Sequence, residues 1–207
     1  MGKIMNSLKG FRYLPQALSF SAQSVLVQHV EEIVAHAPFY TPTMPRTGKP
    51  FSVEMTNCGS LGWVSDRIHG YRYQAGHPET REHWPDMPEV LVELWGETTG
   101  YSAPPEACLI NWYRPKAKLG LHVDADEENT EAPVLSISLG DDAWFRIGGL
   151  RRRDPSERLL LNSGDIVVLG GEARRAYHGI DRIIPGSNNL LGREGRLNLT
   201  LRRVSVD

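Results

Sequence analysis

The chain has 207 residues, of which 40% are hydrophobic and 23% are charged. This balance excludes collagen, coiled-coil and disordered proteins, and the length suits a single domain over residues 1–207. The sequence has no apolar run of the ~18 residues that a bilayer span requires and no apolar core of signal-peptide length, so we expect a cytoplasmic protein that does not enter membranes. The net charge of −2 gives no global positive field, so binding of a polyanion would need a local basic patch.

Two segments in the first hundred residues carry apolar side chains at helical spacing. Residues 21–37 show this pattern, with Ser21 as the expected N-cap and a proline directly after the segment. Residues 88–99 repeat it and are followed by Gly100, a typical residue at a helix C-terminus. Between them, residues 40–88 lack helical periodicity and are rich in aromatic residues, Gly and Pro, which predicts either hairpins or a long functional loop.

From residue 105 onward the pattern changes to short strands separated by turn signals. Helices followed by a series of strands predict an α+β, mainly β protein, built as a helix-backed β-sandwich or jelly roll. The expected strands are residues 107–113, 119–124, 134–139, 143–149, 158–161, 165–171 and 196–204.

Three residues of the strand region form a candidate metal site. His122 and Asp124 are two residues apart in an expected strand, so their side chains should share one face. His178 follows a later strand and is the candidate third ligand. Two His and one carboxylate with open positions describe the facial triad of non-haem Fe(II) oxygenases. On these residues alone, a zinc hydrolase or a surface His–Asp pair with an unrelated buried His remains open.

The segment RLNLTLR, residues 196–202, alternates strictly between leucines and polar residues. Its polar face carries Arg196, Asn198, Thr200 and Arg202 and has no acidic partner. Such a face is usually exposed to solvent, but two arginines with neutral donors between them also suit a small dicarboxylate. Asn111 and Tyr113 share a strand face and could donate to the same ligand. A dicarboxylate clamp beside an Fe(II) site indicates a 2-oxoglutarate oxygenase and disfavours the zinc hydrolase.

An acidic run, Asp126–Glu128, follows the expected metal ligand Asp124 closely. Acidic loops are usually solvated. Because this loop leaves a metal ligand, part of it should face the open metal positions, where a carboxylate would suit a cationic substrate.

In this order, the motifs resemble the AlkB-type oxidative nucleic-acid dealkylases, and their bacterial DNA-repair members most closely. The likeness is strongest from Met55 to Arg202. The matching segments include MTNCGSLGW, GYRY, ACLINWY, LHVDADE, GDIVV, YHG and RLNLTLR.

The resemblance implies a double-stranded β-helix over residues 105–204 and a nucleotide-recognition lid over residues 40–88. It implies Fe(II) at His122, Asp124 and His178, with O₂ and 2-oxoglutarate as cosubstrates. The 2-oxoglutarate ligands that it implies are Asn111, Tyr113, Arg196, Asn198 and Arg202. The residues that it places against the damaged nucleotide are Trp63, Tyr71, Tyr73, Asp126 and Arg152. For Tyr73, a place in the core remains an alternative.

The implied reaction is demethylation of 1-methyladenine and 3-methylcytosine in DNA, with release of formaldehyde, succinate and CO₂. Single-stranded DNA should be the easier substrate, because a base must leave the duplex to reach a buried iron. The same chemistry on RNA or on a protein side chain is the main alternative, and a binding protein without activity is another. We expect a monomer.

Overall fold

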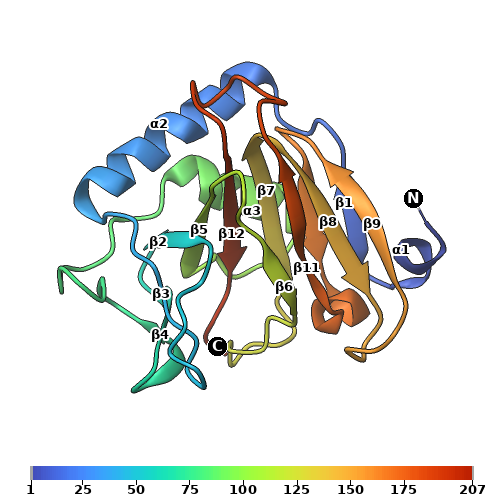
Figure 1. Ribbon diagram of the computed structural model, residues 1–207, viewed down its shortest axis with the longest axis horizontal. Coiled ribbons are helices and arrows are strands. Elements are labelled where there is room, and N and C mark those ends of the chain that lie inside the picture. The colour runs from blue at the N-terminus through green and yellow to red at the C-terminus, as the bar shows by residue number, and fades with distance from the viewer. Residues whose placement is uncertain (1, 207) are drawn as a thin grey trace.

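A six-stranded antiparallel sheet, buried on both faces at its centre, is the main element of the fold (Figure 1). It belongs to a computed structural model that describes residues 2–206. Every residue of its neighbouring inner strands β5 (Ala107–Tyr113) and β12 (Arg196–Arg202) is buried. The strand order is β1-β10-β7-β12-β5-β2. The other four strands are β1 (Phe11–Leu14), β2 (Glu54–Cys58), β7 (Val134–Gly140) and β10 (Ile166–Leu169).

A second sheet of four strands covers one face of the large sheet, in the order β6-β11-β8-β9. A hydrophobic cluster shared by both sheets includes Leu109 and Val167 from the first and Phe145, Leu161 and Ile180 from the second. Two facing antiparallel sheets are the architecture of a jelly roll. The predicted fold class is therefore confirmed. The strands of this sheet are β6 (Leu119–His122), β8 (Asp142–Gly148), β9 (Ser156–Leu161) and β11 (His178–Ile184).

Two long helices cover the other face of the large sheet. They are α2 (Phe20–His36) and α3 (Glu89–Thr99), and both contribute to a second cluster with the leucines of β12. The α3 boundaries agree with the prediction, and Gly100 closes the helix with φ +67°. Short helical turns also occur at α1 (Lys3–Ser7) and η1 (Gly171–Arg175). Within residues 2–206 no helix combines the length and the apolar character that crossing a bilayer demands.

The start of α2 differs from the prediction. Its N-cap is Ser19, whose hydroxyl accepts a hydrogen bond from the backbone N–H of Ala22 at 3.2 Å. The predicted N-cap, Ser21, lies inside the helix and its hydroxyl contacts that of Ser19. Both serines lie within three residues of Ala22, where the apolar helical pattern begins, so the sequence did not distinguish them.

A hairpin occupies the middle of the 40–88 segment, as one of the two predicted alternatives. It consists of β3 (Gly62–Asp66) and β4 (Gly70–Gln74), which form a separate two-stranded sheet next to β2 (Figure 1). Asp66 stabilises the turn, because its carboxylate accepts from the backbone N–H groups of Ile68 and His69. The hairpin thus has a defined shape of its own beside the sandwich.

Candidate active site

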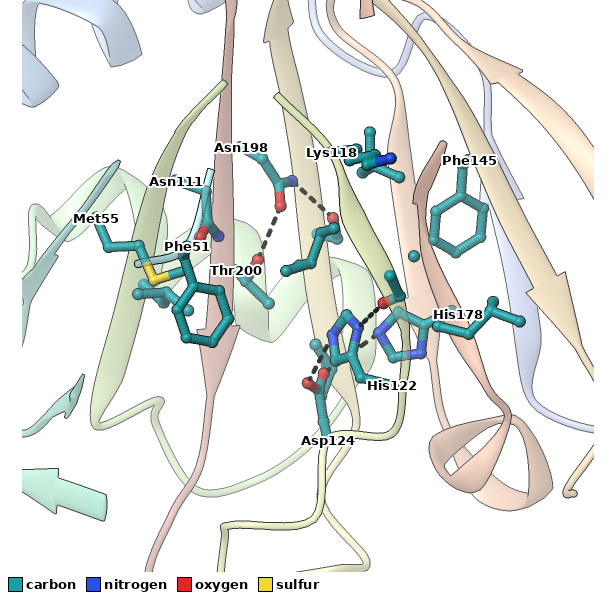
Figure 2. A pocket seen from close by; sticks show the side chains of 18 of the residues that line it. Phe51, Met55, Asn111, Lys118, His122, Asp124, Phe145, His178, Asn198 and Thr200 are labelled. Atoms are coloured by element: carbon teal, nitrogen blue, oxygen red, sulfur yellow. Dashed lines mark hydrogen bonds and ion pairs between the residues drawn. The ribbon is translucent and has the colours of Figure 1, made fainter. Parts of the chain in front are cut away.

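The three predicted metal ligands meet at one end of the four-stranded sheet (Figure 2). His122 ends β6, and His178 begins β11 directly opposite it in the strand register. Asp124 lies past the end of β6, so the two residues do not share a strand face as predicted. Its carboxylate nevertheless turns back to within 3.6 Å of His122 Nε2 and 3.7 Å of His178 Nε2. The candidate ligand atoms all lie within 4.8 Å of one another.

Backbone carbonyls orient both imidazole rings. His122 Nδ1 lies 2.9 Å from the carbonyl oxygen of Gly120, and His178 Nδ1 lies 3.0 Å from that of Ala176. Because a carbonyl oxygen only accepts, each Nδ1 carries the proton and each Nε2 keeps a free lone pair. Both Nε2 atoms face Asp124, which is the tautomer and orientation that a metal ligand needs.

The electrostatics of the site also suit a metal cation. Burial, and to a smaller extent the neighbouring His122, lower the pKa of His178 to about 4, so the ring is a neutral ligand near pH 7. Burial would raise the pKa of Asp124, but Arg202 and the two imidazoles outweigh it and the pKa falls below its ordinary value. Among the described residues, nothing donates a hydrogen bond to the buried Asp124 Oδ2. This donor set fits Fe(II).

The ligands line a cavity of about 560 Å³ between the two sheets, and several predicted groups share its wall. Figure 2 shows Asn111 and Asn198 on strands of the large sheet, and His122 and His178 on the facing four-stranded sheet, around the same pocket. All the predicted 2-oxoglutarate ligands line the cavity: Asn111, Tyr113, Arg196, Asn198 and Arg202. So do the predicted nucleotide contacts Trp63, Tyr71, Asp126 and Arg152.

Arg196 is buried with unused hydrogen-bonding capacity. It is only 1% exposed, and its Nη2 donates to Ser138 Oγ at 2.9 Å. Its Nε and Nη1 have no hydrogen-bond partner among residues 2–206, and the same holds for the buried Asn111 Oδ1. Leaving a guanidinium unpaired in the interior costs several kcal/mol, so an anionic ligand in this cavity would be strongly favoured. The dicarboxylate interpretation of β12 therefore fits its geometry.

The far end of β12 reaches the metal site. Arg202 Nη2 lies 3.0 Å from Asp124 Oδ1, in an ion pair whose side chains are 8% and 7% exposed. Asn198 lies between the two arginines and is held by the sheet, because its amide donates to Ser136 Oγ and accepts from Thr200 Oγ1. The polar face of the strand is thus buried and faces the cavity, and it is not exposed to solvent.

The comparison with known proteins agrees with this site. Residues 10–202 match the family described as the 2OG-Fe(II) oxygenase superfamily. The chain belongs to this superfamily. Over 204 residues it is 51% identical to the alpha-ketoglutarate-dependent dioxygenase AlkB homolog of Caulobacter vibrioides, covering 99% of this chain and 92% of the relative. Its identity to AlkB of Escherichia coli is 44% over 190 residues, covering 90% and 87%.

A solved structure extends the likeness to three dimensions. The structure of OsALKBH1 superposes with a TM-score of 0.79 at 30% identity, covering 94% of this chain and 98% of that one. The protein is thus an AlkB-type dioxygenase that uses Fe(II), 2-oxoglutarate and O₂.

On the outer side of the oxygenase cavity, the hairpin supplies a pair of aromatic rings. Trp63 stacks on Tyr71 with a centroid distance of 5.5 Å and an interplanar angle of 25°. Trp63 Nε1 donates to Asp126 Oδ2 at 2.8 Å, so the hairpin is joined to the loop that follows Asp124. Arg152 is exposed, and its guanidinium donates to the Leu121 carbonyl at the end of β6.

Tyr73 differs from the other predicted nucleotide contacts of the oxygenase. Of the described residues predicted for the site, it alone does not line the cavity. Its hydroxyl donates to Glu127 Oε1 at 2.5 Å and lies 3.3 Å from Arg202 Nη1. Its direct contact with the nucleotide stays a prediction.

Two residues of the oxygenase site were not predicted in the roles that they have. Glu127 belongs to the acidic run expected in solvent or facing substrate, but its side chain is 1% exposed and pairs with Arg174 Nη2 at 2.7 Å. Arg174 also donates to the backbone carbonyls of Ala132 and Asp124. No sequence signal links the two residues, because Arg174 comes from η1, which the sequence pattern did not predict.

His122→Ala should abolish turnover and lower the affinity for Mn(II) by more than the ~100-fold that loss of an outer-shell partner costs. The fold should persist, because His122 lies at a strand end and its side chain is 36% exposed. Calorimetric titration with Mn(II) and thermal unfolding measure the two effects. His29→Ala on α2 is the control, and equal Mn(II) affinity in the two variants would refute the ligand assignment.

Arg196→Met should raise the KM for 2-oxoglutarate by about 100-fold, because the variant loses a charged donor buried in the cavity wall. Arg193→Met is the matched control, since Arg193 lies over the Trp112 ring at 4.4 Å and does not line the cavity. Succinate formation measured at increasing 2-oxoglutarate concentration gives the KM of each variant. An unchanged KM in Arg196→Met would contradict the clamp.

Proposed function

We propose that this dioxygenase repairs alkylated DNA by oxidative removal of N-methyl groups from 1-methyladenine and 3-methylcytosine. The observation that carries the proposal is one cavity lined by the metal ligands, the dicarboxylate clamp and the Trp63–Tyr71 pair beside Asp126. A flat ligand that reaches this aromatic pair lies in the same cavity as the metal ligands. The names of the AlkB relatives support the dioxygenase chemistry of this proposal.

The charge of the lesion is the second argument. Methylation at these ring positions leaves the base cationic, whereas ordinary bases are neutral. An aromatic face attracts a cation by about 0.5–2 kcal/mol, and Trp is the best such face. The Asp126 carboxylate already accepts from Trp63 Nε1, and it can also accept from an exocyclic amine of the base. The aromatic pair and the carboxylate together favour a cationic base over a neutral one.

The metal ligands lie inside a cavity, which determines how a DNA base can reach them. A base stacked in a duplex must be flipped out, which costs a few kcal/mol and costs least in a single strand. Arg151, Arg152 and Arg153 form an exposed basic turn at the cavity side that suits phosphates. We therefore propose single-stranded DNA as the preferred substrate, residues 40–88 as the recognition lid, residues 105–204 as the catalytic core and a monomer as the active form.

In this mechanism the residues of the chain bind, orient and shield the reactants. His122, Asp124 and His178 would hold Fe(II), while Arg196 with Asn111 and Tyr113 would bind the distal carboxylate of 2-oxoglutarate. Arg202 and Asn198 would bind the cosubstrate nearer the metal. When bound, Fe(II) would let O₂ oxidise 2-oxoglutarate to succinate and CO₂, a reaction that places one oxygen atom in succinate and the other in a C–H bond of the methyl group. The hydroxymethyl base then loses formaldehyde, and the unmodified base is restored.

Reconstitution with Fe(II) and 2-oxoglutarate, followed by air and a single-stranded oligonucleotide containing 3-methylcytosine, tests the function directly. We expect loss of one methyl group in the intact mass with a matching amount of formaldehyde, dependent on both iron and 2-oxoglutarate. The unmethylated oligonucleotide and the His122→Ala variant are the controls. Succinate without demethylation would contradict the DNA assignment and direct the search to RNA or protein substrates.

Trp63→Ala should raise the KM for the methylated oligonucleotide about tenfold, because the stacking face is lost. Substrate-independent succinate formation should persist, since the metal ligands and clamp are untouched. Trp63→Phe keeps a ring but loses the hydrogen bond to Asp126. Its KM for the oligonucleotide should lie between those of the unmodified protein and Trp63→Ala. If Trp63→Ala lowers both activities equally, the hairpin does not recognise the nucleotide.

A further inference from the structure

A buried carboxylate, Glu127, joins three elements behind the cavity wall. Its Oε1 accepts the hydroxyl proton of Tyr73, on β4, at 2.5 Å and lies 3.3 Å from Arg202 Nε, on β12. Its Oε2 accepts from Arg174, on η1, at 2.7 Å. With 1% of its side chain exposed, Glu127 is too enclosed to serve as a solvated loop acid.

These contacts fix the orientation of the Arg202 guanidinium. Its Nε faces Glu127, its Nη1 faces the Tyr73 hydroxyl at 3.3 Å, and its Nη2 faces Asp124 at 3.0 Å. Each nitrogen of the group therefore faces a different side chain, and Nε has the Glu127 ion pair but no hydrogen bond among residues 2–206. Two of these partners, Glu127 and Tyr73, also contact each other, so the three side chains form a closed ring of polar contacts.

The charges in this cluster balance. Arg174 and Arg202 are cationic, and Asp124 and Glu127 are anionic, with all four side chains at most 8% exposed. Buried ions are tolerated when they are paired and hydrogen-bonded, and removal of one leaves its partners uncompensated. The Tyr73 hydroxyl is the member of the ring that belongs to the hairpin. This hydroxyl joins the hairpin to Arg202 of the clamp.

We propose that Glu127 is a positioning residue, which holds Arg202 in the orientation that receives 2-oxoglutarate and makes this depend on the seated hairpin through Tyr73. The inference rests on the proposed assignment of Arg202 to 2-oxoglutarate. It gives Tyr73 a role behind the cavity wall, as a link between the hairpin and the cosubstrate site. If the hairpin moved away, the Tyr73 hydroxyl would leave Arg202 Nη1 and Glu127, and fewer contacts would orient the Arg202 guanidinium.

Calorimetric titration of 2-oxoglutarate into the Mn(II)-loaded protein, without nucleic acid, tests this proposal. Tyr73→Phe removes one oxygen atom, and Glu127→Gln removes the charge while keeping the shape. Each should weaken 2-oxoglutarate binding about tenfold and change Mn(II) affinity far less. Because both act through the same guanidinium, the double variant should lose little more than the weaker-binding single variant.

Matched controls separate positioning from general damage. Glu131→Gln changes an exposed acid of the same loop, and Tyr101→Phe removes a hydroxyl that accepts from Asn129. Both should bind 2-oxoglutarate as the unmodified protein does. Folded Tyr73→Phe and Glu127→Gln proteins with unchanged 2-oxoglutarate affinity would overturn the proposal, and so would losses that simply add in the double variant.

A further variant distinguishes this inference from the assignment beneath it. Arg202→Met should itself lose most of the 2-oxoglutarate affinity. If Arg202→Met binds 2-oxoglutarate with unchanged affinity, the assignment of Arg202 to the clamp fails, and the proposal fails with it. If Arg202→Met loses binding while Glu127→Gln keeps it, only the positioning role is overturned. The outcome does not depend on the nucleic-acid substrate, since none is present.

Discussion

The structure depends on a charged strand face buried between two sheets. β12 runs through the centre of the large sheet, with its leucines packed beneath the helices and its two arginines facing the cavity. Burial of a guanidinium is costly unless anions and acceptors surround it. Arg202 forms ion pairs with Asp124 and Glu127, whereas two nitrogens of Arg196 have no hydrogen-bond partner among residues 2–206. The two ends of one strand therefore differ in how fully the protein itself pairs their guanidinium groups with carboxylates.

The loop between β6 and β7 brings the separate functions together. It supplies Asp124 to the metal site, Asp126 to Trp63 of the hairpin and Glu127 to the arginine cluster. Asp124 thus lies at the metal site and Asp126 bonds to the hairpin, while the next residue, Glu127, is buried in the arginine cluster. A displacement of the loop would move Asp124 and disturb the Trp63–Asp126 hydrogen bond and the Glu127–Arg202 ion pair at once.

Sequence patterns predicted those parts of the site whose members lie near one another along the chain. Alternation along residues 196–202 identified a polar face, and the spacing of His122 and Asp124 identified two ligands. The sequence pattern could not predict the Glu127–Arg174 pair, because the two residues come together only when η1 packs against the loop between β6 and β7. β11 was missed for a related reason. Its register shifts between Ile180 and Arg182, which breaks the alternation that marks a strand.

Two nitrogens of Arg196 have no hydrogen-bond partner among residues 2–206, so a ligand that pairs with them would also stabilise the folded chain. A ligand that binds only the folded chain raises its stability by RT ln(1 + [L]/Kd). A small dicarboxylate that occupies this clamp therefore acts as a chemical chaperone as well as a reactant. The resistance of the enzyme to heat and to proteases should then rise and fall with the supply of such acids around it.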